Sequence, residues 1–393
     1  MKQIITALFL TTLLAACSQN GSDTTPEPPH SEAITLNSWL NEAYDARLQL
    51  SPLTLASLGR KERYGEFDDV SAEGQQAALD IYRQQIASMQ EVFEYSELSP
   101  QEQLRYDYYI YLYERAVAEA EFSDHVFVFN QMDGVHTNYP QQVMTYHEIS
   151  SKQDALDYVS RVSGMAEALR FKLDQAKANA ANNVRPPQFA YELVISESQS
   201  LISGQPFDQS NTDSPLFDHA QKALNELISQ SELSSDEADA IRSALTQVLL
   251  NELLPVYSDI IAFAQAELEF ATPTAVSSGI GNTPRAAEYY AMLLKSFTTT
   301  DLSAEEIHQI GLDEVARLTI EMEQLKESVG FEGTLVEFFD YIQTDERFFY
   351  PNTDEGRQAY LDDSTNYIND LLERAPEFFS RLPNTPLEVR RVE

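Results

Sequence analysis

The histidines are the side chains of this sequence best suited to metal or acid–base chemistry. A zinc peptidase helix places two histidines four residues apart on one face, and the glutamate after the first acts as general base. No two histidines here have that spacing, and the Glu148 that follows His147 has no second histidine after it; the six are His30, His125, His136, His147, His219 and His308. The sequence therefore predicts no metal ligand set and no catalytic residue within this chain.

Glu305 and His308 have the Glu-x-x-His spacing used by carboxylate-bridged di-iron bundles. Such a centre needs a second pair on a facing helix, and the only other Glu-x-x-His, Glu27 to His30, lies in a proline-rich stretch. We therefore reject the di-iron interpretation. His308 either forms a structural hydrogen bond or faces a substrate cleft, and the sequence leaves both interpretations open.

Tyrosine and aspartate supply the remaining candidates. A tyrosine near a reacting centre can donate a hydrogen bond to a developing oxyanion, so Tyr289 and Tyr290 are candidates for that role, with ordinary packing as the alternative. Asp133 and His136 lie in a predicted loop, where binding residues often occur, although a turn aspartate and a capping histidine explain them as well. The substrate-cleft candidates are thus His308, Tyr289, Tyr290 and His136. No Gly-x-Ser-x-Gly elbow supports serine-hydrolase chemistry.

Helices must position these side chains, and the clearest helix is predicted over residues 303–329. Ser303 and Glu306 have the spacing of a capping box, and Gly330 is a typical residue after a helix C-terminus. Apolar or small residues recur at intervals of three or four, which predicts one buried stripe; they are Ile307, Gly311, Val315, Leu318, Met322, Leu325 and Val329.

Comparable patterns predict helices along most of the chain. The predicted ranges are 34–50, 52–58, 71–93, 100–122, 152–182, 187–202, 217–230, 234–270, 286–297, 334–343 and 354–381. Residues 132–140 are predicted as a loop, and short strands are predicted at 125–129, near Gly279 and at 387–392. The fold class is therefore all-α with a few short strands. Pro255 should kink its helix, and residues 203–215 form a possible break between subdomains.

The first thirty residues read as a targeting segment rather than as structure. Lys2 and a short apolar run precede Leu14-Ala-Ala-Cys17, which is typical of a lipoprotein signal peptide over residues 1–16, followed by acylation of Cys17. Cys17 is the only cysteine, so no disulfide is possible, and residues 17–30 form a flexible tether. We expect anchoring to the lipid bilayer of a bacterial cell envelope. Ser18 favours the outer membrane, facing the periplasm.

The formal net charge of −37 excludes some partners. Such a chain repels nucleic acid and anionic lipid headgroups, so neither is an expected partner. The charge is spread along the predicted helices. It therefore indicates a solvated acidic surface, or a surface suited to cationic substrates.

Three segments resemble the signature of one protein family. They are NQMDGVHTNYP at residues 130–140, RPPQFAYELVI at 185–195 and TTTDLSAEEIHQIGLDEVARL at 298–318. Together they resemble a bacterial lipoprotein family catalogued as domain of unknown function 885, which looks like a set of mostly helical zinc metallopeptidases. The resemblance departs locally at Gly281-Asn-Thr-Pro284, where the family usually has a tryptophan and a Pro-x-Gly turn.

The resemblance implies a zinc-binding His-Glu-x-x-His helix downstream of the signature, and the sequence ends at Glu393 before any such motif. We therefore expect residues 31–393 to be a truncated, peptidase-like helical domain. In its full-length form the protein would hold zinc and hydrolyse a peptide substrate, while this chain alone would hold no cofactor and be inactive. The alternative is a complete, non-catalytic helical lipoprotein that acts in binding or as a scaffold.

Overall fold

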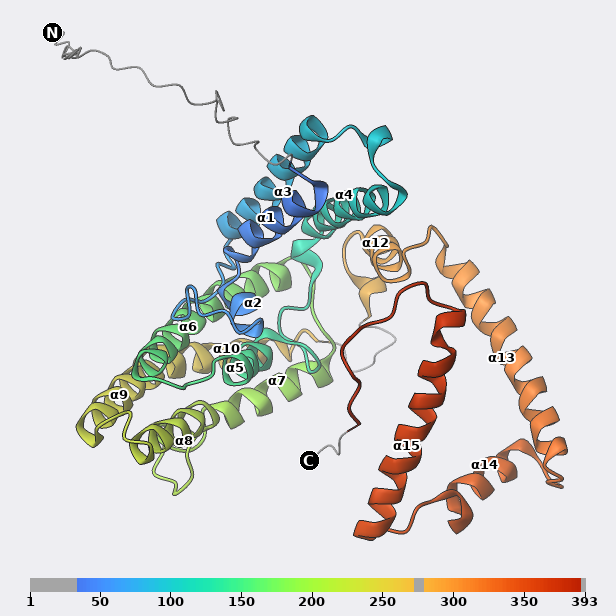
Figure 1. The fold of residues 1–393 in the computed structure, drawn as a ribbon. Helices are drawn as coiled ribbons and strands as arrows, with labels where there is room; N and C mark the ends of the chain where they lie inside the picture. Colours follow the sequence, from blue (N-terminus) through green and yellow to red (C-terminus); the bar gives the residue numbers. More distant parts are fainter. Residues whose placement is uncertain (1–33, 272–278, 390–393) are drawn as a thin grey trace, which may run out of the picture. The chain divides into compact units, whose positions relative to one another are not determined.

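The computed structural model describes residues 34–271 and 279–389, and these residues confirm the all-α fold class (Figure 1). Within these residues there is no strand, only one isolated bridge between Gln205 and Asp213. The chain divides into two compact units, Met1–Met292 (unit 1) and Leu293–Glu393 (unit 2). The boundary between these two units lies inside helix α12 (Ala286–Thr298), and the subdomain break near residues 203–215 stays a prediction.

Unit 1 begins with a small aromatic core between three long helices, α1 (Leu36–Leu48), α3 (Ala72–Val92) and α4 (Pro100–Glu121). Figure 1 shows these helices side by side, and the short α2 (Pro52–Ser57) follows α1. The Trp39 ring meets Phe93 and Tyr109 edge to face at centroid distances of 6.3 and 5.7 Å. The tyrosines of α4 therefore divide between core and surface, because Tyr106 and Tyr109 are buried and Tyr108 is exposed.

The main hydrophobic core of unit 1 lies between six helices that pack closely on one another. Leu169 on one helix and Ile260 on another are fully buried there, and burying such a side chain contributes roughly 1.5–3 kcal/mol. The helices are α5 (Val135–Tyr146), α6 (Lys152–Ala181), α7 (Gln188–Leu201), α8 (Pro215–Ser229), α9 (Ser235–Val248) and α10 (Leu254–Glu267). A π-helical turn, Leu249–Leu253, joins α9 to α10, and Pro255, where the sequence predicted a kink, is the second residue of α10.

Helix α5 corrects the prediction that residues 132–140 form a loop. Pro140 lies inside this helix and has no N–H for the carbonyl of His136, four residues earlier. The buried Tyr257 hydroxyl donates a hydrogen bond to that carbonyl instead. The helix therefore tolerates its proline because a residue 121 positions away satisfies the orphaned acceptor.

The predicted strand at residues 125–129 is also wrong. Ser123–His125 is a 3-10 turn, and the chain then runs without regular structure into α5. Val128 and Phe129 are both buried, so the apolar residues do not alternate between two faces. No strand lies beside them in the part of the chain described here. Residues 387–389 have no regular structure either, while 272–278 and 390–392 lie outside the described residues.

Unit 2 contains α13 (Ala304–Ser328), α14 (Leu335–Thr344) and α15 (Asp354–Arg374). Its aromatic cluster packs Phe331 against the buried Phe338 and against Tyr341, at centroid distances of 5.3 and 5.1 Å. No residue of α13 is buried, so the predicted buried stripe is wrong for this structure. Within the unit α13 packs on the short α14, which leaves its apolar stripe in solvent: Val315 is 64%, Leu318 48% and Leu325 49% exposed.

Two sequence predictions concern membranes. The predicted signal peptide, the predicted acylation site Cys17 and the predicted tether all lie outside the described residues. Among the residues described, none of the helices combines the length and apolar composition needed to cross a bilayer.

Candidate functional site

The segment 126–134 of unit 1 is a turn fixed by side-chain amides. The Asn130 Oδ1 accepts the backbone N–H groups of Met132 and Asp133 at 2.9 and 3.0 Å, and its Nδ2 donates to the Phe127 carbonyl at 3.0 Å. From α6, the buried Asn179 donates to the Val126 carbonyl at 3.0 Å. The backbone of the turn is therefore held by two side-chain amides, Asn130 within the turn and Asn179 on α6.

The approach of this turn to α5 depends on Gly134. A Cβ atom added at Gly134 would lie 2.4 Å from the Asn130 carbonyl oxygen and 2.7 Å from the His136 Cε1. A larger residue at that position therefore does not fit unless the backbone moves. The glycine of the Asp133-Gly-Val-His136 motif thus has a steric role.

His136, a predicted cleft residue, is fully buried behind the turn. Its Nε2 lies 2.9 Å from a Glu197 carboxylate oxygen on α7. Burial lowers the pKa of His136, although Glu197 acts in the opposite direction. The geometry fits a neutral imidazole that donates from Nε2 and links α5 to α7, and its Nδ1 has no partner among the described residues.

A cavity of about 660 Å³, here called the turn cavity, opens beside this segment. It brings together two of the three segments that carried the family resemblance, since residues 130–133 form one wall and 186–189 another. The predicted Tyr289 completes it from α12. The lining residues are Val126, Phe127, Asn130, Gln131, Met132, Asp133, Pro186, Pro187, Phe189, Gly279, Ile280 and Tyr289.

The second wall of the turn cavity is anchored by an ion pair that is mostly buried. The Arg185 Nε lies 2.6 Å from a carboxylate oxygen of Glu267 on α10. Pro186 and Pro187 follow directly, and their fixed φ angles restrict the chain before α7 begins. Phe189, in the first turn of α7, remains partly exposed at the cavity.

Tyr289 and Tyr290 have different surroundings. The Tyr289 ring is 7% exposed and lies 5.5 and 5.4 Å from the rings of Phe122 and His125. Burial raises the pKa of Tyr289, so its hydroxyl stays protonated at neutral pH. Tyr290 is 46% exposed and does not line the turn cavity.

His308 lies exposed on α13 in unit 2. The structure thus brings together Tyr289 and the turn in front of His136, whereas Tyr290 and His308 are not part of this cavity. The roles of all four residues remain predictions. Asn130 and Phe189 also belong to the site and were not predicted from the sequence. Both lie in the segments that resemble the family, and that shared location was the signal that could have found them.

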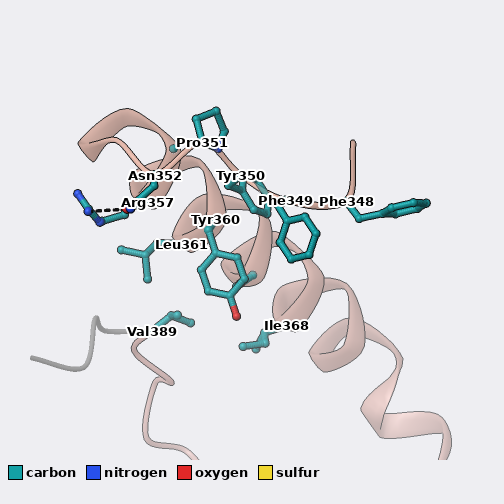
Figure 2. Close-up of a pocket in the computed structure, with 12 residues that line it drawn as sticks. Phe348, Phe349, Tyr350, Pro351, Asn352, Arg357, Tyr360, Leu361, Ile368 and Val389 are labelled. Carbon is teal, nitrogen blue, oxygen red and sulfur yellow. Dashed lines mark hydrogen bonds between the residues drawn. The ribbon is translucent and has the colours of Figure 1, made fainter. Parts of the chain in front are cut away.

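Unit 2 has a hollow of its own, of about 840 Å³, along α15 (Figure 2). Phe349, Tyr350 and Tyr360 line it with apolar residues of α15, and Val389 closes one side. A Cβ added at Gly356 would lie 2.0 Å from the Pro351 carbonyl oxygen, so glycine lets the preceding loop lie against the helix. The Tyr350 hydroxyl donates to Asp363 at 2.7 Å.

The described residues do not fit the zinc ion that the resemblance implies. Nowhere among residues 34–271 and 279–389 do three or more histidine, aspartate or glutamate side chains group as metal ligands. His136 is paired with Glu197, and His147 lies 2.9 Å from the Asp154 carbonyl oxygen. No catalytic step through zinc is derived from these residues.

A family described as "Bacterial protein of unknown function (DUF885)" matches residues 52–393. The chain belongs to this family. The match covers all three quoted segments, both walls of the turn cavity and unit 2, so the resemblance noted in the sequence is confirmed as family membership. No curated protein matches this DUF885 chain.

The fold of this DUF885 chain is similar to a crystal structure described as that of a "putative lipoprotein" from Colwellia psychrerythraea. The TM-score is 0.71 at 19% sequence identity, and the match covers 89% of this chain. The chain spans 62% of the length of that protein. At this identity the likeness establishes the fold.

Proposed function

We propose that this DUF885 chain is the N-terminal part of a membrane-anchored, zinc-metallopeptidase-like lipoprotein. In this proposal polypeptide beyond Glu393 supplies the His-Glu-x-x-His zinc site and the peptide-hydrolysing activity. The helices described here form one wall of the substrate cleft, and the chain alone is inactive.

The exposed apolar surface of unit 2 is the observation that carries this proposal. Val315, Leu318 and Leu325 recur along one stripe of α13, yet each is about half exposed or more. Contiguous exposed apolar surface marks sites that another polypeptide or a membrane covers. The structural relative supports the same view, because this chain spans only 62% of it.

The lipid anchor is supported by the sequence around Cys17. Small residues precede the single cysteine at the end of a short apolar run, as a lipoprotein signal peptide requires. Acylation would tether the domain to the bacterial envelope, and Ser18 favours the outer membrane with the domain in the periplasm. A single acyl chain binds only weakly, so we expect more than one chain on this anchor.

A non-catalytic binding lipoprotein is the second candidate function. The turn cavity favours it, because this cavity lies within unit 1, which packs around its own core. In that case the cavity would be the functional site, and unit 2 would dock on a partner.

The product of the whole gene tests these proposals. We expect it to extend past Glu393, to bind one zinc ion per chain measured by elemental analysis, and to be in the membrane fraction, whereas a Cys17→Ser form becomes soluble. The chain ending at Glu393 should bind no zinc and cleave no peptide. A stop codon directly after Glu393 would contradict the peptidase proposal and favour the binding lipoprotein, and an unchanged Cys17→Ser distribution would contradict the anchor.

A further inference from the structure

We infer that the turn cavity of unit 1 binds an amphipathic cation, meaning a ligand that joins a bulky apolar group to a positive charge. The proposal of a zinc site does not involve this cavity. An experiment can therefore contradict the cavity ligand without contradicting the zinc site, and the reverse. The volume of about 660 Å³ matches a ligand of about two amino-acid residues.

The apolar part of the ligand is indicated by the walls. Phe127, Phe189 and Tyr289 line the cavity from three separate segments of unit 1, and Pro186 and Pro187 add further apolar surface to the lining. Met132 stands at the rim with 85% of its surface exposed, and a flexible thioether adapts to ligands of different shape. Burying an apolar group here would remove these side chains from water.

The positive charge of the ligand is indicated by the charge of the residues that line the turn cavity. Of the described residues that line the turn cavity, Asp133 alone is charged at neutral pH, and none is lysine, arginine or histidine. Asp133 is exposed and forms no ion pair with any residue in the described part of the chain. Aromatic faces also attract cations, and the net charge of −37 disfavours an anion further.

The backbone that carries Asp133 is held in place before any ligand binds. Its backbone N–H donates to the Asn130 side chain at 3.0 Å, and Gly134 lets the turn approach α5 closely. On the other wall, Arg185 and Glu267 hold the chain that leads to Phe189. A pre-formed site loses less conformational entropy on binding, so these contacts favour recognition of a specific ligand shape.

Three capped dipeptides that differ only in charge test this inference: N-acetyl-Phe-Lys-amide, N-acetyl-Phe-Gln-amide and N-acetyl-Phe-Glu-amide. Their dissociation constants with this chain are measured by nuclear magnetic resonance titration at 0.15 M salt. We expect the lysine probe to bind at least about fivefold more tightly than the glutamine probe, a ratio that corresponds to about 1 kcal/mol for the positive charge. The glutamate probe should bind most weakly of the three.

Matched variants separate the cavity from the general acidity of the chain. Asp133→Asn should weaken the binding of the lysine probe about fivefold and leave the dissociation constant of the glutamine probe unchanged. Asp259→Asn removes an exposed charge on α10 and should change the binding of neither probe. Phe189→Ala should weaken all three probes, and Phe171→Ala, a similarly exposed phenylalanine on α6, should weaken none. Equal binding of the three probes, or equal effects of Asp133→Asn and Asp259→Asn, would overturn the inference.

Discussion

At the scale of single residues, Tyr257 decides the conformation of a segment far away in the sequence. Its hydroxyl donates to the carbonyl of His136, which Pro140 leaves without its helical partner. Both Tyr257 and His136 are fully buried, so water cannot replace this hydrogen bond. The start of α5 and the turn in front of it therefore depend on one phenol from α10.

Tyr257→Phe should destabilise unit 1. The change removes the donor and leaves a buried carbonyl unpaired, which costs about 1–3 kcal/mol of the free energy of unfolding. Tyr191→Phe is the matched control, because Tyr191 is also buried but none of the hydrogen bonds described here involves its hydroxyl, and it should change stability by less than about 0.5 kcal/mol. Urea unfolding followed by the fluorescence of Trp39, the only tryptophan, measures both. Equal values for the two variants would disprove the role of Tyr257.

His147 makes stability depend on pH. Burial lowers its pKa to about 4, and the nearby Arg161 guanidinium acts in the same direction, while the Asp154 carbonyl opposes it. The unfolded chain binds a proton at this residue below pH 6.5, whereas the folded chain does so only near pH 4. The free energy of unfolding is therefore not reduced by His147 above pH 6.5. As pH falls from 6.5 toward 4, protonation of this residue in the unfolded chain lowers the free energy of unfolding by about 3 kcal/mol in total.

A His147→Gln variant isolates that contribution from the carboxylates of the chain. Its unfolding free energy should fall less between pH 7 and pH 4.5 than that of the parent, because glutamine does not titrate. The absolute stability of the variant at pH 7 is not the measured quantity, so a general loss of stability does not affect the comparison. Parallel pH profiles for parent and variant would show that His147 is not the titrating group.

At the scale of elements, helix starts are the part of the fold that the sequence predicts best. The capping boxes at Ser99, Ser234 and Ser303 are all formed, because their partners lie three residues away and the signal is local. Helix α5 was missed because its proline is tolerated only through Tyr257, a contact that no local pattern contains. The strand at residues 125–129 failed because residue type favours a strand but cannot supply a neighbouring one.

The candidate site was also predicted only in part, because local patterns do not contain contacts between distant segments. Asp133, His136 and Tyr289 were selected from residue type and motif, and two of them line the turn cavity. The Phe189 wall was not predicted, because spacing along the chain does not tell which segments meet in space. For α13, periodicity correctly gave one apolar stripe, but periodicity reports where apolar residues lie on a helix and not whether anything covers them.

At the scale of the whole molecule, the two units differ in how completely they bury their apolar residues. Unit 1 holds a continuous core that includes Leu169, Val194 and Ile260. In the described part of unit 2, Phe338 and Gly356 are buried, while long aromatic and aliphatic side chains remain in solvent. Our central proposal rests on this contrast: unit 1 packs around a core of its own, and the exposed apolar surface of unit 2 is a docking face for further polypeptide.

Hydrogen–deuterium exchange of backbone amides tests this claim most directly, because protection reports local stability along the chain. In the chain ending at Glu393 we predict strong protection in α6, α7 and α10 and exchange at least about a hundredfold faster in α13 and α15, since few buried contacts hold the latter. In the product of the whole gene, α13 and α15 should become protected while α6 stays unchanged. Protection of α13 equal to that of α6 in the shorter chain would contradict the account.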